Sequence, residues 1–205
     1  MARSTVTIIC SVFLVGLLLG PLISLINFSG LSLSLSNSDI AAIKFTFVQA
    51  AYSATLSTIL AIPVAKALLR QNFWGKGFVV LILGAPFILP VIVAVLGLIL
   101  VFGNNGIVNN LLNLIGLGSV KVYGFWGVIL AHVFFNLPLA IRILLQALND
   151  VPGEHYRLVS SLKLSFTQNF LALEWPVLKK VCPGIWAVIF AICLSSFSVA
   201  LTLGG

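Results

Sequence analysis

The sequence contains few charged residues. Asp, Glu, Lys and Arg make up 7% of its 205 residues, whereas 60% are hydrophobic and the mean hydropathy is +1.20. A soluble domain needs charged side chains to cover its surface, so this composition excludes one. Acids are the scarcest, with four against eleven cations. The resulting net charge of +7 does not indicate nucleic-acid binding, because the cations stand at the ends of apolar runs and form no basic face.

The sequence also lacks the motifs of a catalyst or a metal site. It has no GxxxxGK[ST] nucleotide-binding motif, no CxxC pair and no Cys/His spacing typical of zinc. The three cysteines, Cys10, Cys182 and Cys193, are best interpreted as small apolar side chains. Glu154 beside His155 is expected to be a surface pair. We therefore predict a chain without enzymatic activity, cofactor or metal.

Long uncharged runs are abundant instead. Charged residues are absent from 4–38, 45–65, 77–120, 122–141 and 181–205. Each run is about as long as the roughly 20 residues that cross a bilayer as a helix, or longer. Because the backbone must satisfy its own hydrogen bonds in lipid, the runs predict an all-α, polytopic membrane helix bundle.

We predict one transmembrane domain over 1–205, with five spans at about 6–26, 44–69, 78–102, 125–148 and 184–203. A signal peptide is the alternative for the first span, but its apolar run exceeds the usual length of about 7–15 residues and no A-x-A site follows. Nine cations fall on the side of the N-terminus and two on the other side. This bias predicts a cytoplasmic N-terminus and a cytoplasmic loop at 149–183.

Polar or helix-bending residues inside the predicted spans are candidates to line a pathway. They are Gln49, Tyr52, Ser53, Pro86, Pro90, His132, Asn136, Ser195 and Ser198. The two prolines remove two backbone donors, so we expect the third span to be bent or broken. An ionisable residue inside a span suggests a function, and His132 shares a helical face with Asn136. The alternatives are a neutral His132 bonded to Asn136 or a neighbouring helix, and hydroxyls that serve only helix packing.

The longest polar interval, 149–183, carries a recognisable pattern. Pro152 is followed, after a helical stretch, by Gln168, Phe170 and the pair Trp175-Pro176. This pattern resembles the cytoplasmic EAA loop of the membrane-spanning subunits of bacterial ABC importers. Where that family has Glu-Ala-Ala and a later Gly, this sequence has Arg157, Leu158-Val159 and Lys163. The resemblance implies that the loop docks on an ATPase through Pro152, Glu154, Arg157, Leu158, Leu162, Lys163, Phe166, Phe170, Trp175 and Pro176.

The spacing of apolar residues in this loop is compatible with docking. Leu158, Leu162 and Ser165 follow an i, i+4, i+7 spacing, and Phe166 and Phe170 are four residues apart. We expect two short helices, with a break near 163–165, that insert into a groove of the ATPase. The alternative is an amphipathic hairpin that lies on the membrane surface.

The resemblance extends over nearly the whole chain. The segments LAHVFFNLPLA and SFSVALTLGG are most similar to the N-terminal half of the two-part permeases for thiamine and, more distantly, ferric iron. This implies a subunit of a thiamine importer in the bacterial inner membrane. Its implied partners are a cytoplasmic ABC ATPase dimer, a periplasmic or external substrate-binding protein, and a second permease half or a homodimer partner.

Two further expectations follow from the resemblance. Only one half is present, which suggests a fragment or the product of a split gene. The alternatives for the function are a permease for ferric iron or another small solute, and an ion-coupled secondary carrier. No acid lies within a predicted span, which argues against proton coupling.

Overall fold

The computed structural model describes residues 24, 36–71, 73–119, 121, 123–162 and 165–204. The chain divides into two compact units, Met1–Ala42 and Ile43–Gly205. In the first unit the described residues are Ser24 and 36–42, so the predicted span at 6–26 lies outside the described residues apart from Ser24. The rest of this section concerns helix α2 and the second unit.

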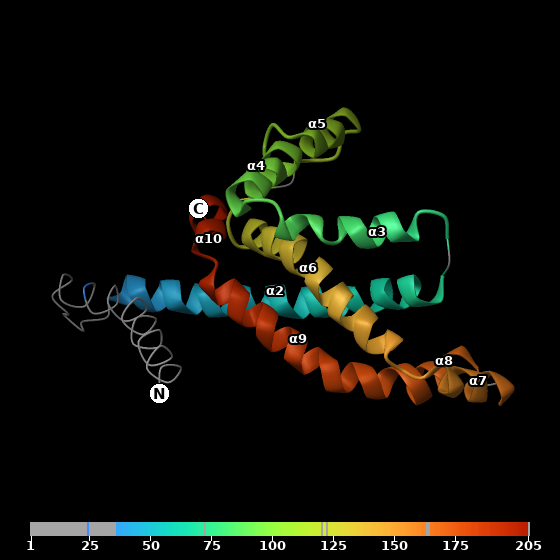
Figure 1. Cartoon of the computed structure of the whole chain (residues 1–205). Helices are drawn as coiled ribbons and strands as arrows, with labels where there is room; N and C mark the ends of the chain where they lie inside the picture. Colours follow the sequence, from blue (N-terminus) through green and yellow to red (C-terminus); the bar gives the residue numbers. More distant parts are fainter. Residues whose placement is uncertain are drawn as a thin grey trace, which may run out of the picture. The chain divides into compact units, whose positions relative to one another are not determined.

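Regular structure in the described residues is entirely helical (Figure 1). The α-helices are α2 (Asn37–Arg70), α3 (Lys76–Ile82), α4 (Val91–Phe102), α5 (Ile107–Leu114), α6 (Phe125–Asn149), α7 (Gly153–Ser161), α8 (Phe166–Asn169), α9 (Trp175–Ser195) and α10 (Phe197–Leu203). A 3-10 turn, η1 (Ala85–Phe87), precedes α4, and a π-helical turn, η2 (Phe170–Glu174), joins α8 to α9.

Four helical stretches of the described chain are long and apolar enough to cross a membrane. They are Asn37–Arg70, Val91–Leu114, Phe125–Asn149 and Thr167–Ser195. The second of these comprises α4 and α5 with a short interruption between them, and the fourth includes α8 and η2. The prediction of an all-α membrane helix bundle is therefore confirmed.

Two helices extend beyond the predicted spans, whose bounds stay a prediction. Helix α2 begins at Asn37 and not at 44, because Asp39 in its first turn accepts a hydrogen bond of 2.9 Å from the Ser36 backbone N–H, as in a capping box. Helix α9 begins at Trp175 and not at 184. Pro176 occupies its first turn, where no backbone N–H is needed, and the helix continues through Pro183.

The expected break of the third span occurs at the two prolines. Helix α3 ends at Ile82, and α4 begins only at Val91, directly after Pro90. Pro86 lies in the intervening 3-10 turn. Proline cannot donate the helical hydrogen bond, so neither residue extends the helix on its N-terminal side.

The main core lies among α2, α6 and α9. Helix α2 contributes four fully buried alanines, Ala50, Ala54, Ala61 and Ala65, and α6 and α9 contribute larger side chains such as Leu144 and Ile189. A smaller cluster joins α4, α6 and α10. Because lipid tails are as apolar as these side chains, packing and buried hydrogen bonds hold the helices together.

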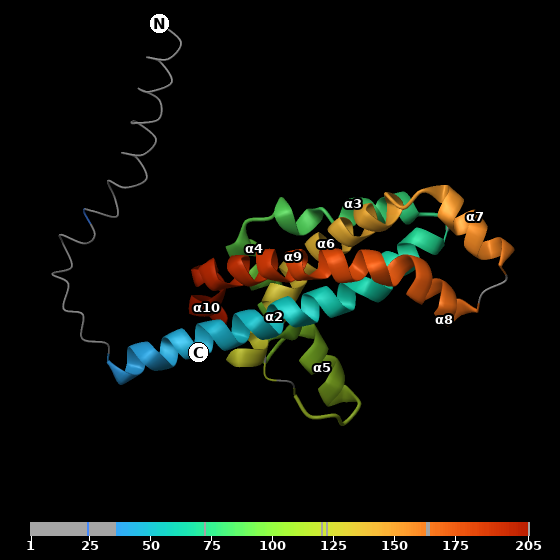
Figure 2. The same cartoon turned by 90° about the horizontal axis from the view of Figure 1, so that it is seen from below.

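The loop between α6 and α9 lies at one end of the second unit. Figures 1 and 2 both place α7 and α8 at the end where α2 terminates in Arg70, and α10 at the opposite end. The loop is therefore positioned to contact the terminal turns of α2.

Candidate functional site

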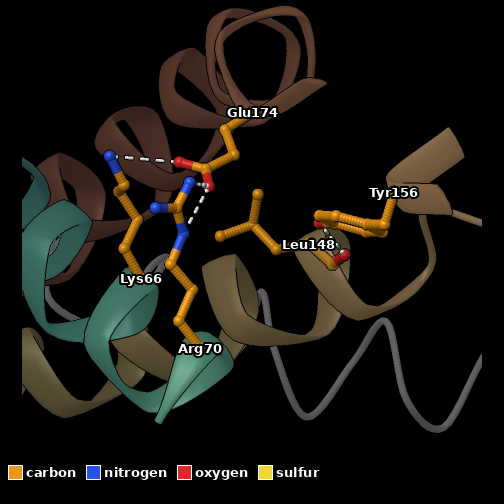
Figure 3. A network of polar contacts seen from close by, with 5 residues as sticks. All are labelled: Lys66, Arg70, Leu148, Tyr156 and Glu174. Atoms are coloured by element: carbon orange, nitrogen blue, oxygen red, sulfur yellow. Dashed lines mark hydrogen bonds and ion pairs between the residues drawn. The ribbon is translucent and has the colours of Figure 1, made fainter. Parts of the chain in front are cut away.

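The centre of the candidate site is Glu174, the last residue of η2. Its side chain is fully buried, and both of its carboxylate oxygens are paired with cations of α2 (Figure 3). Lys66 Nζ lies 3.1 Å from Oε2. Arg70 Nε donates a hydrogen bond of 3.0 Å to Oε1, and Arg70 Nη2 contacts the same oxygen. We call Lys66, Arg70 and Glu174 the Glu174 clamp.

An aromatic contact adds to the clamp. The Lys66 ammonium lies 3.8 Å from the centroid of the Phe170 ring, a cation–π arrangement. Phe170 also lies beside Trp175, with 6.2 Å between the ring centroids. The residues Phe170–Glu174 form a π-helical turn, a feature that is frequent at functional sites. The return arm of the loop is therefore attached to α2 at both ends of this turn.

Helix α7 is connected to the same region through Tyr156. Its hydroxyl donates a hydrogen bond of 3.5 Å to the carbonyl of Leu148 at the end of α6 (Figure 3). Burial raises the pKa of Tyr156, and the nearby negative charge of Glu174 raises it further, while Arg70 acts in the opposite direction. Tyr156 and Asn169 line the same surface pocket as Arg70, so both arms of the loop converge on the end of α2.

The predicted docking residues divide into an exposed group and an anchoring group. Pro152, Glu154, Arg157, Leu162 and Pro176 are exposed, Leu162 to 67%. Trp175 is 48% exposed, and Phe170 is half-buried against Lys66. Lys163 and the side chains of Leu158 and Phe166 lie outside the described residues.

The expected pair of short helices is present. Helix α7 ends at Ser161 and α8 begins at Phe166. Docking of this pair on an ATPase stays a prediction. The exposed face that docking requires is carried by α7 and Leu162, whereas Phe170 faces the protein's own α2.

Three of the predicted pathway residues meet inside the bundle. His132 Nδ1 lies 2.8 Å from Gln49 Oε1, and because an amide oxygen only accepts, Nδ1 is the donor. Gln49 Nε2 donates to the Cys193 carbonyl at 3.4 Å. Asn136 Nδ2 donates to the His132 carbonyl at 2.8 Å and contacts Cys193 Sγ at 3.4 Å. This buried network joins α2, α6 and α9, which matches the alternative of a histidine bonded to a neighbouring helix.

The other predicted pathway residues do not join this network. Ser53 and Pro86 are buried, whereas Tyr52, Pro90, Ser195 and Ser198 are exposed. Their part in a pathway, and that of the network, stays a prediction. Among the residues described, no three His, Cys, Asp or Glu side chains come together as a metal site would require.

The sequence prediction did not identify Glu174, Lys66 or Arg70 as site residues. Part of the signal was present: two cations four residues apart share a helical face, and the loop expected on the same side of the membrane carries three acids, Asp150, Glu154 and Glu174. The acid that pairs with these cations cannot be chosen from the sequence alone, because it depends on how the helices pack.

The membrane-length helices of the described residues define a multi-pass membrane protein. No family model matches the chain. It is 43% identical over 164 residues to the thiamine transport system permease protein ThiP of Escherichia coli (strain K12), covering 80% of this chain and 31% of that protein. Its identity to ThiP of Brucella abortus (strain 2308) is 38% over 164 residues, covering 79% of this chain and 30% of the relative.

A third relative is named for a different substrate. The chain is 32% identical over 162 residues to the probable sulfate transport system permease protein cysT of Chlorella vulgaris, covering 79% of this chain and 58% of cysT. The chain is thus homologous to ThiP and belongs to the permease family of ABC importers, whose permease subunits are non-catalytic. It spans less than a third of the length of the ThiP relatives it matches.

Proposed function

We propose that the chain forms part of the translocation pathway of an ATP-driven importer in the bacterial inner membrane. In this proposal the N-terminus and the loop at 149–183 are cytoplasmic, and the loop docks on an ABC ATPase dimer. A substrate-binding protein delivers the solute on the opposite side. A second permease half or a second copy of the chain completes the pathway.

The observation that carries the proposal is the Glu174 clamp. A docking loop must present an exposed surface to the ATPase and also be attached to a helix of the pathway. Helix α7 and Leu162 supply the exposed surface, and Glu174 attaches the loop to α2 through a buried carboxylate. Movement imposed on α7 therefore reaches α2 through η2, without passing along the whole of α9.

The substrate of this importer is thiamine. The proposal rests on the higher identity to the thiamine permeases, at 38–43%, than to the sulfate permease, at 32%. Thiamine is a cation, and aromatic faces bind organic cations. Tyr52 on α2 and Phe134 on α6 are exposed to 52% and 39%, so their rings are accessible to such a ligand.

The test is purification of the tagged chain from native membranes, with identification of the proteins that remain bound. We expect an ABC ATPase, and we expect the exchange Leu162→Glu to weaken that complex by placing a charge on the docking surface. Leu117→Glu is the matched control, because Leu117 is 57% exposed in the segment that follows α5, outside the membrane-length helices of the described chain. Absence of an ATPase, or equal effects of the two exchanges, would overturn the docking proposal. Uptake of radiolabelled thiamine into cells, competed with sulfate, tests the substrate.

A further inference from the structure

A second feature of the molecule is an apolar groove between α2 and α9. It has a volume of about 350 Å³ and is open to the surface. Its walls include Thr58, Ile59 and Ile62 from α2 and Leu178, Cys182 and Pro183 from α9. Neither the clamp nor the buried histidine network uses these walls, so the groove requires a separate explanation.

One end of the groove is lined by the Trp186 indole, whose polar atom already has a hydrogen-bond partner. Trp186 Nε1 donates a hydrogen bond of 3.0 Å to Thr55 Oγ1, which in turn donates to the Ala51 carbonyl at 2.7 Å. The Trp186 ring stacks on Phe190, with 5.0 Å between centroids. The indole therefore presents only apolar surface to an occupant at this end.

The opposite end carries a positive charge. Lys179 is the one charged residue that lines the groove, and it has no hydrogen bond or ion pair among the described residues. The cations of the clamp differ, because Lys66 and Arg70 are paired with Glu174. Lys179 lies seven residues before Trp186, about 10 Å along the axis of α9, and Trp175 flanks this end.

We infer that this groove binds one anionic phospholipid in the leaflet next to the loop. An acyl chain would lie along the apolar walls, and the headgroup phosphate would contact the Lys179 ammonium. The complementarity is specific: the groove is apolar along its length, positive at the loop end only, and flanked there by a tryptophan, the residue typical of the membrane interface. A helix of a second permease copy would fill the apolar part but would leave Lys179 without a counter-charge.

This lipid would link the same two helices that the Glu174 clamp joins. Lys179 follows Glu174 by five residues on the continuous helical stretch of η2 and α9, and Ile62 precedes Lys66 by one turn on α2. The lipid would therefore stabilise the packing of α9 against α2 next to the clamp. The inference requires only that α2 and α9 lie in the membrane, so it stands even if the loop binds no ATPase.

The test is native mass spectrometry of the purified full chain titrated with phosphatidylglycerol or phosphatidylcholine of identical acyl chains. We expect one phosphatidylglycerol to bind at least about tenfold more tightly than phosphatidylcholine. Lys179→Gln should remove most of that difference, because a charge-assisted contact is lost. Lys180→Gln is the matched control: it deletes the neighbouring exposed cation, which does not line the groove, and should change affinity by less than about twofold.

A second variant tests the acyl part of the site. Cys182→Phe places an aromatic ring in the groove and should weaken both lipids, with folding checked by circular dichroism and gel filtration. Equal binding of the two lipids, or equal effects of Lys179→Gln and Lys180→Gln, would overturn the inference. So would a polypeptide helix found in the groove of the assembled transporter.

Discussion

Arg70 and Glu174 are separated by 104 residues, yet Arg70 Nε donates a hydrogen bond of 3.0 Å to the fully buried Glu174 carboxylate. Lys66, one turn earlier on α2, contacts the other carboxylate oxygen. A buried carboxylate is tolerated only when it is paired, because removing its charge from water is costly. The pairing therefore holds the loop in one position relative to α2.

Exchange of Glu174 for Gln should loosen this link. We expect a loss of stability of ~2 kcal/mol, less than a fully buried pair would cost, because Lys66 and Arg70 retain 17% and 30% exposure and can turn toward water. Thermal unfolding of the detergent-solubilised protein measures this loss. In reconstituted vesicles, an importer assembled from this variant and its ATPase should hydrolyse ATP with reduced uptake of substrate, because movement of the loop no longer reaches α2.

Asp150→Asn is the control for this exchange. Asp150 is an exposed acid at the end of α6, and no ion pair of the described residues involves it. Its exchange also removes one negative charge, and it should leave stability and coupling within about 0.5 kcal/mol and twofold of the parent. If both variants behave alike, the clamp does not couple the loop to α2.

A second prediction separates anchoring from docking within the loop. Phe170→Leu removes the cation–π contact with Lys66 and should lower stability by about 0.5–2 kcal/mol. ATPase affinity should stay unchanged, because the Phe170 ring faces α2. Leu162→Glu should have the converse effect, since Leu162 is exposed and its exchange removes no internal contact. Unfolding curves and ATPase binding isotherms of both variants test this separation of anchoring from docking. A large loss of ATPase affinity in Phe170→Leu would contradict it.

A third prediction concerns the behaviour of the loop at alkaline pH. The pKa of Tyr156 is raised above its ordinary value of 10.0, so in the folded chain the phenol keeps its proton at pH values where the unfolded chain has lost it. The unfolded state then binds fewer protons, and Tyr156 makes stability fall as pH rises above about 10. Below that pH its contribution does not change.

Absorbance at 295 nm measures this directly, because the chain has three tyrosines. One of them should titrate at a higher pH than it does in urea, and Tyr156→Phe should remove that component. Glu174→Gln should move the Tyr156 titration to lower pH, since it deletes a nearby negative charge. An unchanged titration in Glu174→Gln would show that the two side chains do not interact.

Local sequence patterns were sufficient to predict the membrane-length helices but not the Glu174 clamp. Uncharged runs identify the membrane-length helices, and paired prolines identify the break before Val91, because both effects act within one turn or one span. Helix α9 begins at Trp175, before the predicted fifth span at about 184–203. Leu178, which precedes that span, is buried in the core, so tertiary packing extends the helix to Trp175. The residues that pair with Glu174 depend on how α2 and α9 pack. The spacing of apolar residues along one helix does not reveal this packing.

The buried histidine network leads to the last prediction. His132 and Gln49 join α6 to α2 through a hydrogen bond of 2.8 Å, and each is only 2% exposed. If this contact is structural, His132→Leu and Gln49→Leu should each lower stability by about 1–3 kcal/mol, because each leaves a buried polar partner unpaired. The double variant should lose less than the sum, with a coupling energy of about 0.6–1.7 kcal/mol, as for other hydrogen bonds between membrane helices.

Substrate kinetics distinguish this role from a place in the pathway. A residue that contacts thiamine would change KM for uptake in a single variant whose unfolding curve is unaltered. A packing contact would lower the amount of folded transporter and leave KM within about twofold, because no interaction with the substrate is lost. Tyr52→Leu provides the comparison on the exposed face of α2, since Tyr52 is 52% exposed and its ring is accessible to an organic cation. We expect a raised KM for Tyr52→Leu and an unchanged KM for the His132 and Gln49 variants. The reverse pattern would show that the substrate contacts the buried network and not the exposed face of α2.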